Sequence, residues 1–228
     1  AWYGENKDKE KVLNFYSDRW DNILDCQPNA AHLAIAELQS KYNVINITQN
    51  IDNLLERAGC TNVIHLHGSI NDRKCEFHKD IISPPPPVIL EEVIPGFDEI
   101  TDEVFSTKFV CDYEQKGHSG PVKLGELCPK CGGQLRPDVV WFYENVNMME
   151  DYFNDLAAKT DVFIGIGTSA QVQPAAGLLF KFRTVKEKYF IDLNPPLRLH
   201  SFNRLKGTAG EHLPKVVQDL LGKKIEQS

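Results

Sequence analysis

The sequence lacks the features that would place it in several broad classes. No apolar run approaches the roughly 18–20 residues that a helix needs to cross a bilayer, and the charged stretch after Ala1 is not typical of a secretory signal. Basic charge is also in deficit, because the 228 residues carry a net charge of −7 and the pI is near 5.5. A phosphate-binding face needs Lys and Arg. We therefore expect neither a membrane partner nor a nucleic-acid partner.

Cysteine is sparse, and its use points to a compartment. Six cysteines without a secretory signal indicate a reducing, cytoplasmic location, with thiols that bind metal or are buried rather than joined in disulfides. Cys26 and Cys60 are expected to be buried thiols. Internal repeats and heptad arrays are absent as well. A chain with 42% hydrophobic residues and this length can bury a full core, and its acidic surface suits basic partners such as lysine-bearing proteins.

Strand-like and helix-like segments alternate along most of the chain. The β-rich runs cover residues 44–48, 63–67, 139–142, 162–166 and 189–193. The helix-like stretches cover residues 8–24, a segment that opens at Pro28, and residues 54–58, 148–159, 174–183 and 213–221. This alternation predicts an α/β fold with a doubly wound, Rossmann-like parallel sheet and crossover helices. The alternation stops between residues 70 and 136, so we expect a Rossmann-like domain (1–69 and 137–228) and a small inserted module (70–136).

The inserted module holds four of the six cysteines. In the run CPKCGG, two residues separate Cys128 from Cys131, and the glycines allow the tight turn that brings two thiolates to one tetrahedral metal ion. A redox CxxC is the alternative, but the run does not lie at a strand–helix junction. Cys75 would supply a third ligand. The fourth is either Cys111 or His78, and four thiolates are the commoner structural set.

Polar segments follow strand-like runs at the positions where open α/β sheets bind ligands. Residues 48–52 (TQNID) offer amides and a carboxylate for ribose hydroxyls and a carboxamide, although Asp52 could equally cap the next helix. His67, which precedes Gly68, is either a turn residue or a general base. Residues 165–170 (GIGTSA) satisfy a loose dinucleotide fingerprint between a strand and a helix. Hydroxyls and N–H groups at a helix start bind phosphate without a basic residue.

In their order along the chain and in their combination, these segments resemble the motifs of the sirtuin family, the NAD-dependent enzymes that remove acyl groups from lysine. The resemblance rests on TQNID at 48–52, LHGS at 66–69, the cysteine-rich insert, VVWF at 139–142 and GTS at 167–169. It implies NAD and zinc as cofactors, His67 as the general base, and a closed, structural zinc site. The implied cofactor-binding residues are Gln49, Asn50, Ile51, Asp52, Gly167, Thr168, Ser169, Asn194 and Ala209. The implied peptide-binding residues are Val140 and Phe142, and the implied zinc ligands are Cys75, Cys128, Cys131 and Cys111 or His78.

The sequence departs from the sirtuin pattern in two places. The family's first strand with its GAGxS turn, and the TFR motif that follows, do not occur, and residues 1–4 resemble the stretch after them. Tyr143 stands where the family usually has glycine, so it either narrows the acyl-lysine tunnel or points outward.

Tyr16 and Arg19 are three residues apart in the first helix-like stretch, so their side chains share a face. The run FYSDR resembles the Y-x-x-R signature of the sirtuin branch that accepts malonyl, succinyl and glutaryl lysine. An arginine fork and a phenol hydroxyl would supply charge-assisted hydrogen bonds to an acyl carboxylate. The alternative is that Tyr16 packs in the core while Arg19 pairs with Asp18 or Asp21.

Three functions agree with the sequence. The first is an NAD-dependent protein-lysine deacylase with deacetylase and desuccinylase or demalonylase activity, which would act on acyl-lysine proteins and give nicotinamide and O-acyl-ADP-ribose. The second is an ADP-ribosyltransferase or NAD hydrolase that uses the same pocket. The third is a non-catalytic NAD- or peptide-binding module, which the missing GAGxS segment favours.

Overall fold

The computed structural model describes residues 6–78, 111–141, 144, 146, 149–168 and 175–222. By their contacts, the residues form two compact units. Unit 1 consists of Ala1–Cys26 and His67–Asn145, and unit 2 consists of Gln27–Leu66 and Val146–Ser228. This grouping does not test the expected domain boundaries near residues 70 and 136, which stay a prediction.

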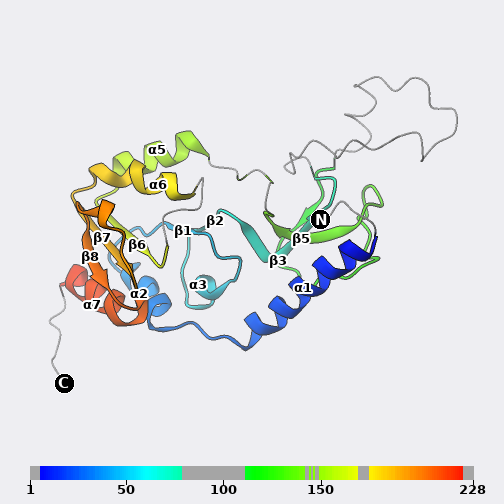
Figure 1. Cartoon of the computed structure of the whole chain (residues 1–228), viewed down its shortest axis with the longest axis horizontal. Helices are drawn as coiled ribbons and strands as arrows, with labels where there is room; N and C mark the ends of the chain where they lie inside the picture. Colours follow the sequence, from blue (N-terminus) through cyan, green and yellow to red (C-terminus); the bar gives the residue numbers. More distant parts are fainter. Residues whose placement is uncertain are drawn as a thin grey trace. The chain divides into compact units, whose positions relative to one another are not determined.

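Unit 2 is an α/β unit with two parallel sheets (Figure 1). In chain order its elements are α2 (Ala30–Leu38), β1 (Asn46–Thr48), α3 (Leu54–Arg57), β2 (Val63–His65), α5 (Glu150–Lys159), β6 (Val162–Ile166), α6 (Ala175–Lys181), β7 (Glu187–Asp192), β8 (Asn203–Lys206) and α7 (Ala209–Leu221). β1 pairs with β2, and β6, β7 and β8 form the second sheet in that order. The predicted α/β class with parallel sheets is confirmed.

Helices cover both faces of the sheet formed by β6, β7 and β8 (Figure 1). Successive residues of a strand point to opposite faces, and β7 buries both Phe190, which is 0% exposed, and Ile191, which is 1% exposed. Ile191 packs with residues of α2 and α7, whereas Phe190 packs with Leu179 of α6. α2 begins at a capping box in which Asn29 accepts from the His32 N–H and the His32 ring accepts from the Asn29 N–H.

Unit 1 combines one long helix with a small antiparallel sheet. The helix is α1 (Asn6–Asp25), and the strands are β3 (Gly68–Cys75), β4 (Glu114–Gln115) and β5 (Leu135–Val139), in the order β4–β3–β5. Leu13 of α1 is 2% exposed, and it packs in a cluster that contains Cys75, Cys111, Val122, Cys128 and Leu135. The core of unit 1 therefore forms around thiols.

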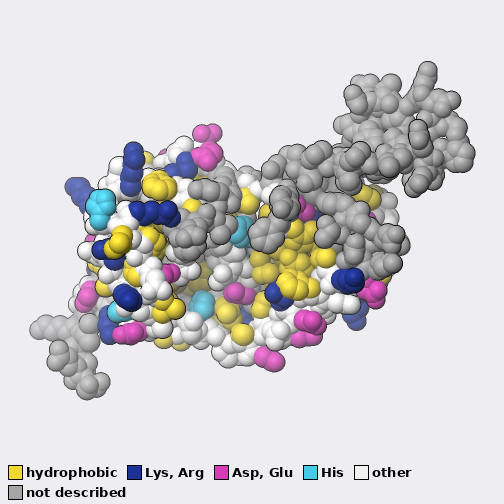
Figure 2. Space-filling model, viewed as in Figure 1, with side chains coloured by type: hydrophobic (Ala, Val, Ile, Leu, Met, Phe, Trp, Pro, Cys, Tyr) yellow, Lys and Arg dark blue, Asp and Glu magenta, His cyan; other side chains and the backbone are white. Residues whose placement is uncertain are grey.

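The surface carries charges of both signs. Figure 2 shows acidic and basic side chains interspersed over the described face that the view presents, with hydrophobic side chains between them. None of the helices in the described part of the chain is both long and apolar enough to span a bilayer.

Two local predictions were wrong, and one strand was missed. The strand expected at residues 139–142 ends at Val139. It pairs antiparallel with β3, and Gly68 lies opposite Val139 in that ladder. The thiol of Cys26 is exposed just past the end of α1, whereas Cys60 is buried as predicted. The short strand β8 was not expected, since its sequence NRLK is polar.

Candidate active site and metal centre

Four cysteine thiols converge in unit 1. The Sγ atoms of Cys75, Cys111, Cys128 and Cys131 all lie within 4.8 Å of one another. Cys75 lies 3.3 Å from Cys131, and Cys111 lies 3.7 Å from Cys128. Four thiols at such spacing can surround one tetrahedral ion. Among the described residues His78 is not part of this group, although its backbone pairs with that of Cys111, so the geometry favours the four-thiolate set.

The backbone around the thiols is shaped for a metal knuckle. The Phe77 N–H donates to Cys75 Sγ at 3.4 Å, and the Tyr113 N–H donates to Cys111 Sγ at the same distance. In the CPKCGG run, Gly132 adopts a φ of +79° and its N–H donates to Cys128 O at 2.8 Å. Glycine adopts a positive φ without steric cost. The tight turn expected from the sequence is therefore present.

The thiols need a compensating cation if all are to be deprotonated. Burial raises the pKa of the Cys75 thiol, and the neighbouring thiols of Cys131 and Cys128 raise it further. Thiolates this close repel one another, and a divalent metal ion removes that penalty. The donor set fits zinc. Each thiol of the CxxC run also has a neighbour from another segment, Cys75 or Cys111, which distinguishes the group from an isolated redox pair.

Two polar segments that are far apart in the sequence meet in unit 2. Gln49, the residue after β1, donates from Nε2 to Thr168 Oγ1 at 3.5 Å, across 119 positions of sequence. Thr168 follows Gly167 just past β6, where Gly167 has a φ of +57° and donates its N–H to Ile191 O at 2.9 Å. Both segments thus lie at the carboxyl ends of parallel strands, the edge at which such sheets bind ligands.

The loop after β1 is held by its own polar groups. The Asn50 N–H donates to Thr48 Oγ1 at 3.0 Å, and the Leu54 N–H donates to Asp52 Oδ1 at 3.0 Å. Ile51 between them is half-buried. One oxygen of the Asp52 carboxylate therefore binds the first N–H of α3, although the N-cap position itself is Asn53, and this bond leaves the second oxygen for another partner.

Sequence reasoning missed His65, the last residue of β2. Its Nδ1 lies 2.9 Å from Asn50 O, and its Nε2 lies 2.8 Å from Glu56 Oε1. The ring therefore ties the polar loop to α3. No spacing rule signals this contact, because one partner is a backbone carbonyl 15 residues away.

Two other predicted cofactor residues follow strands of unit 2, one in a loop and one at the start of a helix. The Asn194 N–H donates to Asp192 Oδ1 at 2.7 Å, just past β7. Ala209 is the first residue of α7 and packs against the apolar cluster that contains Ile191. Three further residues singled out by the sequence lie outside the described residues: Phe142, Tyr143 and Ser169.

His67 lies at the entry to β3, directly after Leu66. Its backbone oxygen accepts from the Val140 N–H at 2.9 Å. Gly68 has a φ of +73°, and a Cβ at this position would lie 1.9 Å from Asp138 O. Only glycine therefore fits after His67. In this way the backbone fixes His67 beside the segment that begins at Val140.

Tyr16 and Arg19 both lie on α1, and both contact the ring of Phe15. The Tyr16 ring stacks on Trp141, with centroids 6.0 Å apart and an interplanar angle of 20°. Burial raises the pKa of the Tyr16 hydroxyl, although the nearby Arg136 opposes this effect. Arg19 is exposed, and its guanidinium carbon lies 3.3 Å from the centroid of the Phe15 ring.

Arg136 organises the segment after β5 and was also missed. Its fully buried guanidinium donates to Glu144 at 2.5 and 2.9 Å and to Val139 O at 2.6 Å. The guanidinium carbon lies 3.3 Å from the Trp141 ring centroid, and the Trp141 N–H donates to Glu144 Oε2 at 3.0 Å. A buried arginine requires such a bidentate partner. The signal in the sequence was an arginine and a glutamate on either side of the apolar VVWF run.

Comparison with known proteins assigns the family. The family model described as "Sir2 family" matches residues 2–174. The chain belongs to the Sir2 family. A Sir2 relative from Bacteroides thetaiotaomicron, named "NAD-dependent protein deacylase", is 37% identical over 192 residues, which are 84% of this chain and 70% of the relative.

Solved Sir2 structures share the fold. A Sir2 homologue in complex with NAD has 32% identity and a TM-score of 0.72, and the match covers 95% of this chain and 73% of that one. A second structure, Sir2Af2 bound to a myristoylated histone peptide, has 28% identity and a TM-score of 0.60, with 95% of this chain and 84% of that one covered. The expected membership of the sirtuins is confirmed.

Proposed function

We propose that this Sir2 chain is an NAD-dependent protein-lysine deacylase that acts on acyl-lysine proteins or peptides. The reaction takes NAD, water and an acyl-lysine, and it yields nicotinamide, lysine and O-acyl-ADP-ribose. The names of the curated relatives support this function. The structural observation that supports it best is the meeting of Gln49 with Thr168, because it joins two of the motif segments at a ligand-binding edge.

The chain's own residues have separate tasks in this proposal. Gln49, Asn50 and Asp52 would hold the carboxamide and ribose of NAD, and Gly167 and Thr168 would face its phosphates, since bare N–H groups and hydroxyls bind phosphate. NAD supplies the ribose carbon that takes the acyl oxygen, with nicotinamide as the leaving group. His67 would accept the proton of a ribose hydroxyl, a task that suits an imidazole near neutral pH.

The four-cysteine site has a structural task. Cys75, Cys111, Cys128 and Cys131 would hold one zinc ion and leave no position for water, so the metal would fold unit 1 without taking part in the reaction. The cytoplasmic location expected from cysteine use stays a prediction.

The test replaces the proposed base. His67→Tyr should lower acyl transfer by about 10²–10⁴-fold while the fold persists, because loss of a general base typically costs that much. His200→Tyr, at an exposed position of unit 2, is the matched control and should keep wild-type activity. Deacylation by His67→Tyr at a near wild-type rate would remove the role of His67. Nicotinamide release that does not need an acyl-lysine would favour the ADP-ribosyltransferase or NAD hydrolase instead.

We further propose that the acyl group can carry a carboxylate, as in succinyl or malonyl lysine. The support is the pair Tyr16 and Arg19 on one helix, with the Arg19 guanidinium exposed. Hydrogen bonds to charged groups are worth about 1.5–3 kcal/mol, so Arg19→Met should cost about 10- to 150-fold in kcat/KM on succinyl-lysine and little on acetyl-lysine. Arg183→Met, exposed in unit 2, is the control. Equal losses on both substrates would return Arg19 to a structural role.

A further inference from the structure

One face of α1 is bound along much of its length to the cysteine module, the part of unit 1 that comprises residues 75–78 and 111–141. The side chains on this face are Lys9, Leu13, Tyr16 and Trp20, which follow one another at intervals of four, three and four residues. Residues at such intervals lie above one another on a helix. Each of them contacts a residue in the part of unit 1 that surrounds the thiols. The helix thus has a single docking face.

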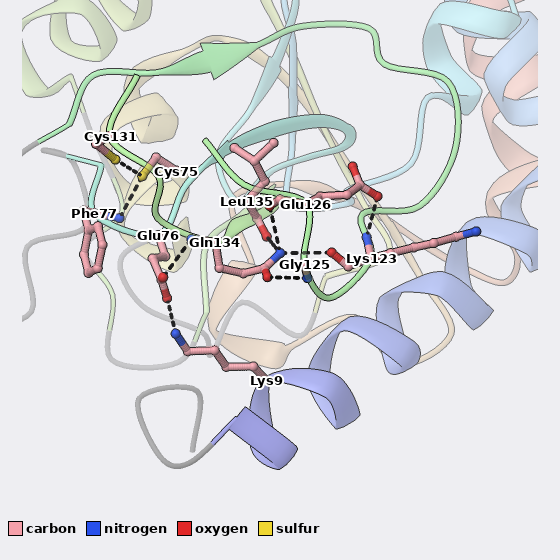
Figure 3. A network of polar contacts seen from close by, with 10 residues as sticks. All are labelled: Lys9, Cys75, Glu76, Phe77, Lys123, Gly125, Glu126, Cys131, Gln134 and Leu135. Carbon is pink, nitrogen blue, oxygen red and sulfur yellow. Dashed lines mark hydrogen bonds and ion pairs between the residues drawn. The ribbon is translucent and has the colours of Figure 1, made fainter. Parts of the chain in front are cut away.

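The first contact is an ion pair at the beginning of the helix. Lys9 Nζ lies 2.7 Å from Glu76 Oε2, and the side chains are only 20% and 6% exposed. Glu76 directly follows the thiol ligand Cys75, and its other carboxylate oxygen accepts from the Gln134 N–H at 2.9 Å (Figure 3). Loss of one partner from a largely buried pair leaves the other charge without compensation, which costs more than the loss of a surface pair.

Gln134 carries the contact further into the module. Its side-chain amide donates to the backbone oxygens of Lys123 and Glu126 at 3.0 and 3.1 Å, and its oxygen accepts from the Gly125 N–H at 2.8 Å (Figure 3). Through Glu76, Lys9 is therefore linked to a loop whose backbone is cross-linked by the hydrogen bonds of Gln134, and not to a single flexible side chain.

The other contacts are apolar and aromatic. Leu13 is 2% exposed within the cluster that includes three of the thiol-bearing residues. At the far end of the helix, the Trp20 ring stacks on His118, with centroids 5.3 Å apart and an interplanar angle of 25°. Tyr16 lies between these two contacts and stacks on Trp141. The position of Tyr16 is therefore set from both sides.

We propose that Lys9 and Glu76 are positioning residues for acyl selectivity: their ion pair holds α1 on the cysteine module and thereby fixes the place of Tyr16. The selectivity part of this inference rests on the proposed function. Neither residue needs to touch the substrate, because both act through the helix.

The experiment compares Lys9→Met with Lys11→Met, an exposed lysine on the same helix. In Lys9→Met, kcat/KM on a succinyl-lysine peptide should fall by about 5- to 10-fold, mainly through KM, well under the roughly 10²-fold that a 1 Å misplacement can cost. Activity on the acetyl-lysine peptide should change less than twofold. Lys9→Arg should restore most of the loss, and Lys11→Met should behave as wild type.

A second readout does not depend on activity. Hydrogen exchange of the α1 amides should become faster in Lys9→Met, while exchange in α7 and the zinc content stay unchanged. In the double variant Lys9→Met/Glu76→Gln, the effects should be less than additive, since the two residues form one contact. Unchanged exchange and an unchanged succinyl-to-acetyl ratio in Lys9→Met would overturn the inference. If the wild type removes neither acyl group, the proposed function fails, and the exchange of α1 still decides whether Lys9 holds the helix.

Discussion

In unit 2 the sheet and the helices meet across apolar side chains such as Ile191 and Leu213, both at most 1% exposed, whereas unit 1 buries Lys74, Glu76 and Arg136 beside its thiols. The apolar clusters of unit 2 involve many weak contacts of similar kind. In unit 1 each of these buried charges has a specific partner, as in Lys74 Nζ with Asp138 Oδ1 at 2.8 Å.

This difference determines which changes should destabilise each unit. An apolar core loses stability in proportion to the volume removed, whereas an ion pair or a metal site fails when a single partner is lost. Unit 1 should therefore be sensitive to chelators, to single charge changes and to pH, and unit 2 should tolerate all three. The following predictions test this contrast.

The largest effect is expected from loss of the metal. Apparent binding free energies of structural zinc are about 10–16 kcal/mol, which is comparable to a whole typical unfolding free energy of about 5–15 kcal/mol. Cys128→Ser or Cys131→Ser should lose zinc and unfold unit 1, while β7 of unit 2 keeps its protection. Metal analysis and hydrogen exchange of β3 and β7 measure this. Cys111→Ser should lose zinc too.

His78→Ala is the matched control for the fourth ligand, because it should retain zinc. Full zinc retention in both Cys128→Ser and Cys131→Ser would contradict the metal site altogether. Zinc loss in His78→Ala with retention in Cys111→Ser would reverse the assignment of the fourth ligand.

An intermediate effect is expected from Arg136→Met. The side chain is 0% exposed and Glu144 is 5% exposed, so the change leaves a buried carboxylate without its partner and should cost about 3–5 kcal/mol. Lys159→Met in unit 2 breaks a pair with Asp155 whose side chains are 72% and 60% exposed, and it should cost less than about 0.5 kcal/mol. Urea unfolding of both variants measures the difference. A loss below about 1 kcal/mol for Arg136→Met would show that unit 1 does not depend on buried pairs.

The smallest effect is a pH dependence of unit 1. Burial lowers the pKa of His118 from its ordinary value of 6.5, and the charge of Arg73 lowers it further, while Glu126 and Asp72 act in the opposite direction. The unfolded chain therefore binds more protons as the pH falls through 6.5. The stability contributed by the neutral ring is fully present above that pH and is lost below it.

His118→Phe isolates this effect, because it keeps an aromatic ring against Trp20 and removes the titration. Its thermal midpoint should vary less between pH 7.5 and pH 5 than that of the wild type. The same pH slope in both proteins would mean that other groups cause the dependence.

The sequence predicted well wherever local chemistry decides the structure. The strand expected at residues 162–166 is present as β6, an apolar run that is at least half-buried along its length. The four cysteines of the insert come together as expected, since their spacing and the glycine turn permit little else. The contacts of Gln49 with Thr168 agree with the order of the motifs, although the roles of these residues stay predictions.

The features that the sequence did not reveal depend on contacts between residues that are far apart in the sequence. β3 has the polar sequence GSINDRKC, and it forms a strand because Arg73 pairs with Glu126 and Lys74 with Asp138. No alternation reveals such a strand, since its polar side chains are satisfied in place and need not point to solvent. For the same reason Leu13, which is among the most buried residues of α1, did not stand out in the sequence as a contact to thiols.

Gly68 gives the protein a constraint on its evolution and redesign. Since any side chain at this position meets the carbonyl of Asp138, residue 68 can change only if the backbone at residue 138 moves. Segments grafted at 138–140 from another protein will be tolerated when they keep the path of that carbonyl and a carboxylate at position 138, which pairs with Lys74. In a library that varies both regions, we therefore expect a free choice of residues on the outward positions and strict retention of glycine at position 68. The backbone of His67 will keep its place through such sequence drift because its oxygen accepts from the Val140 N–H.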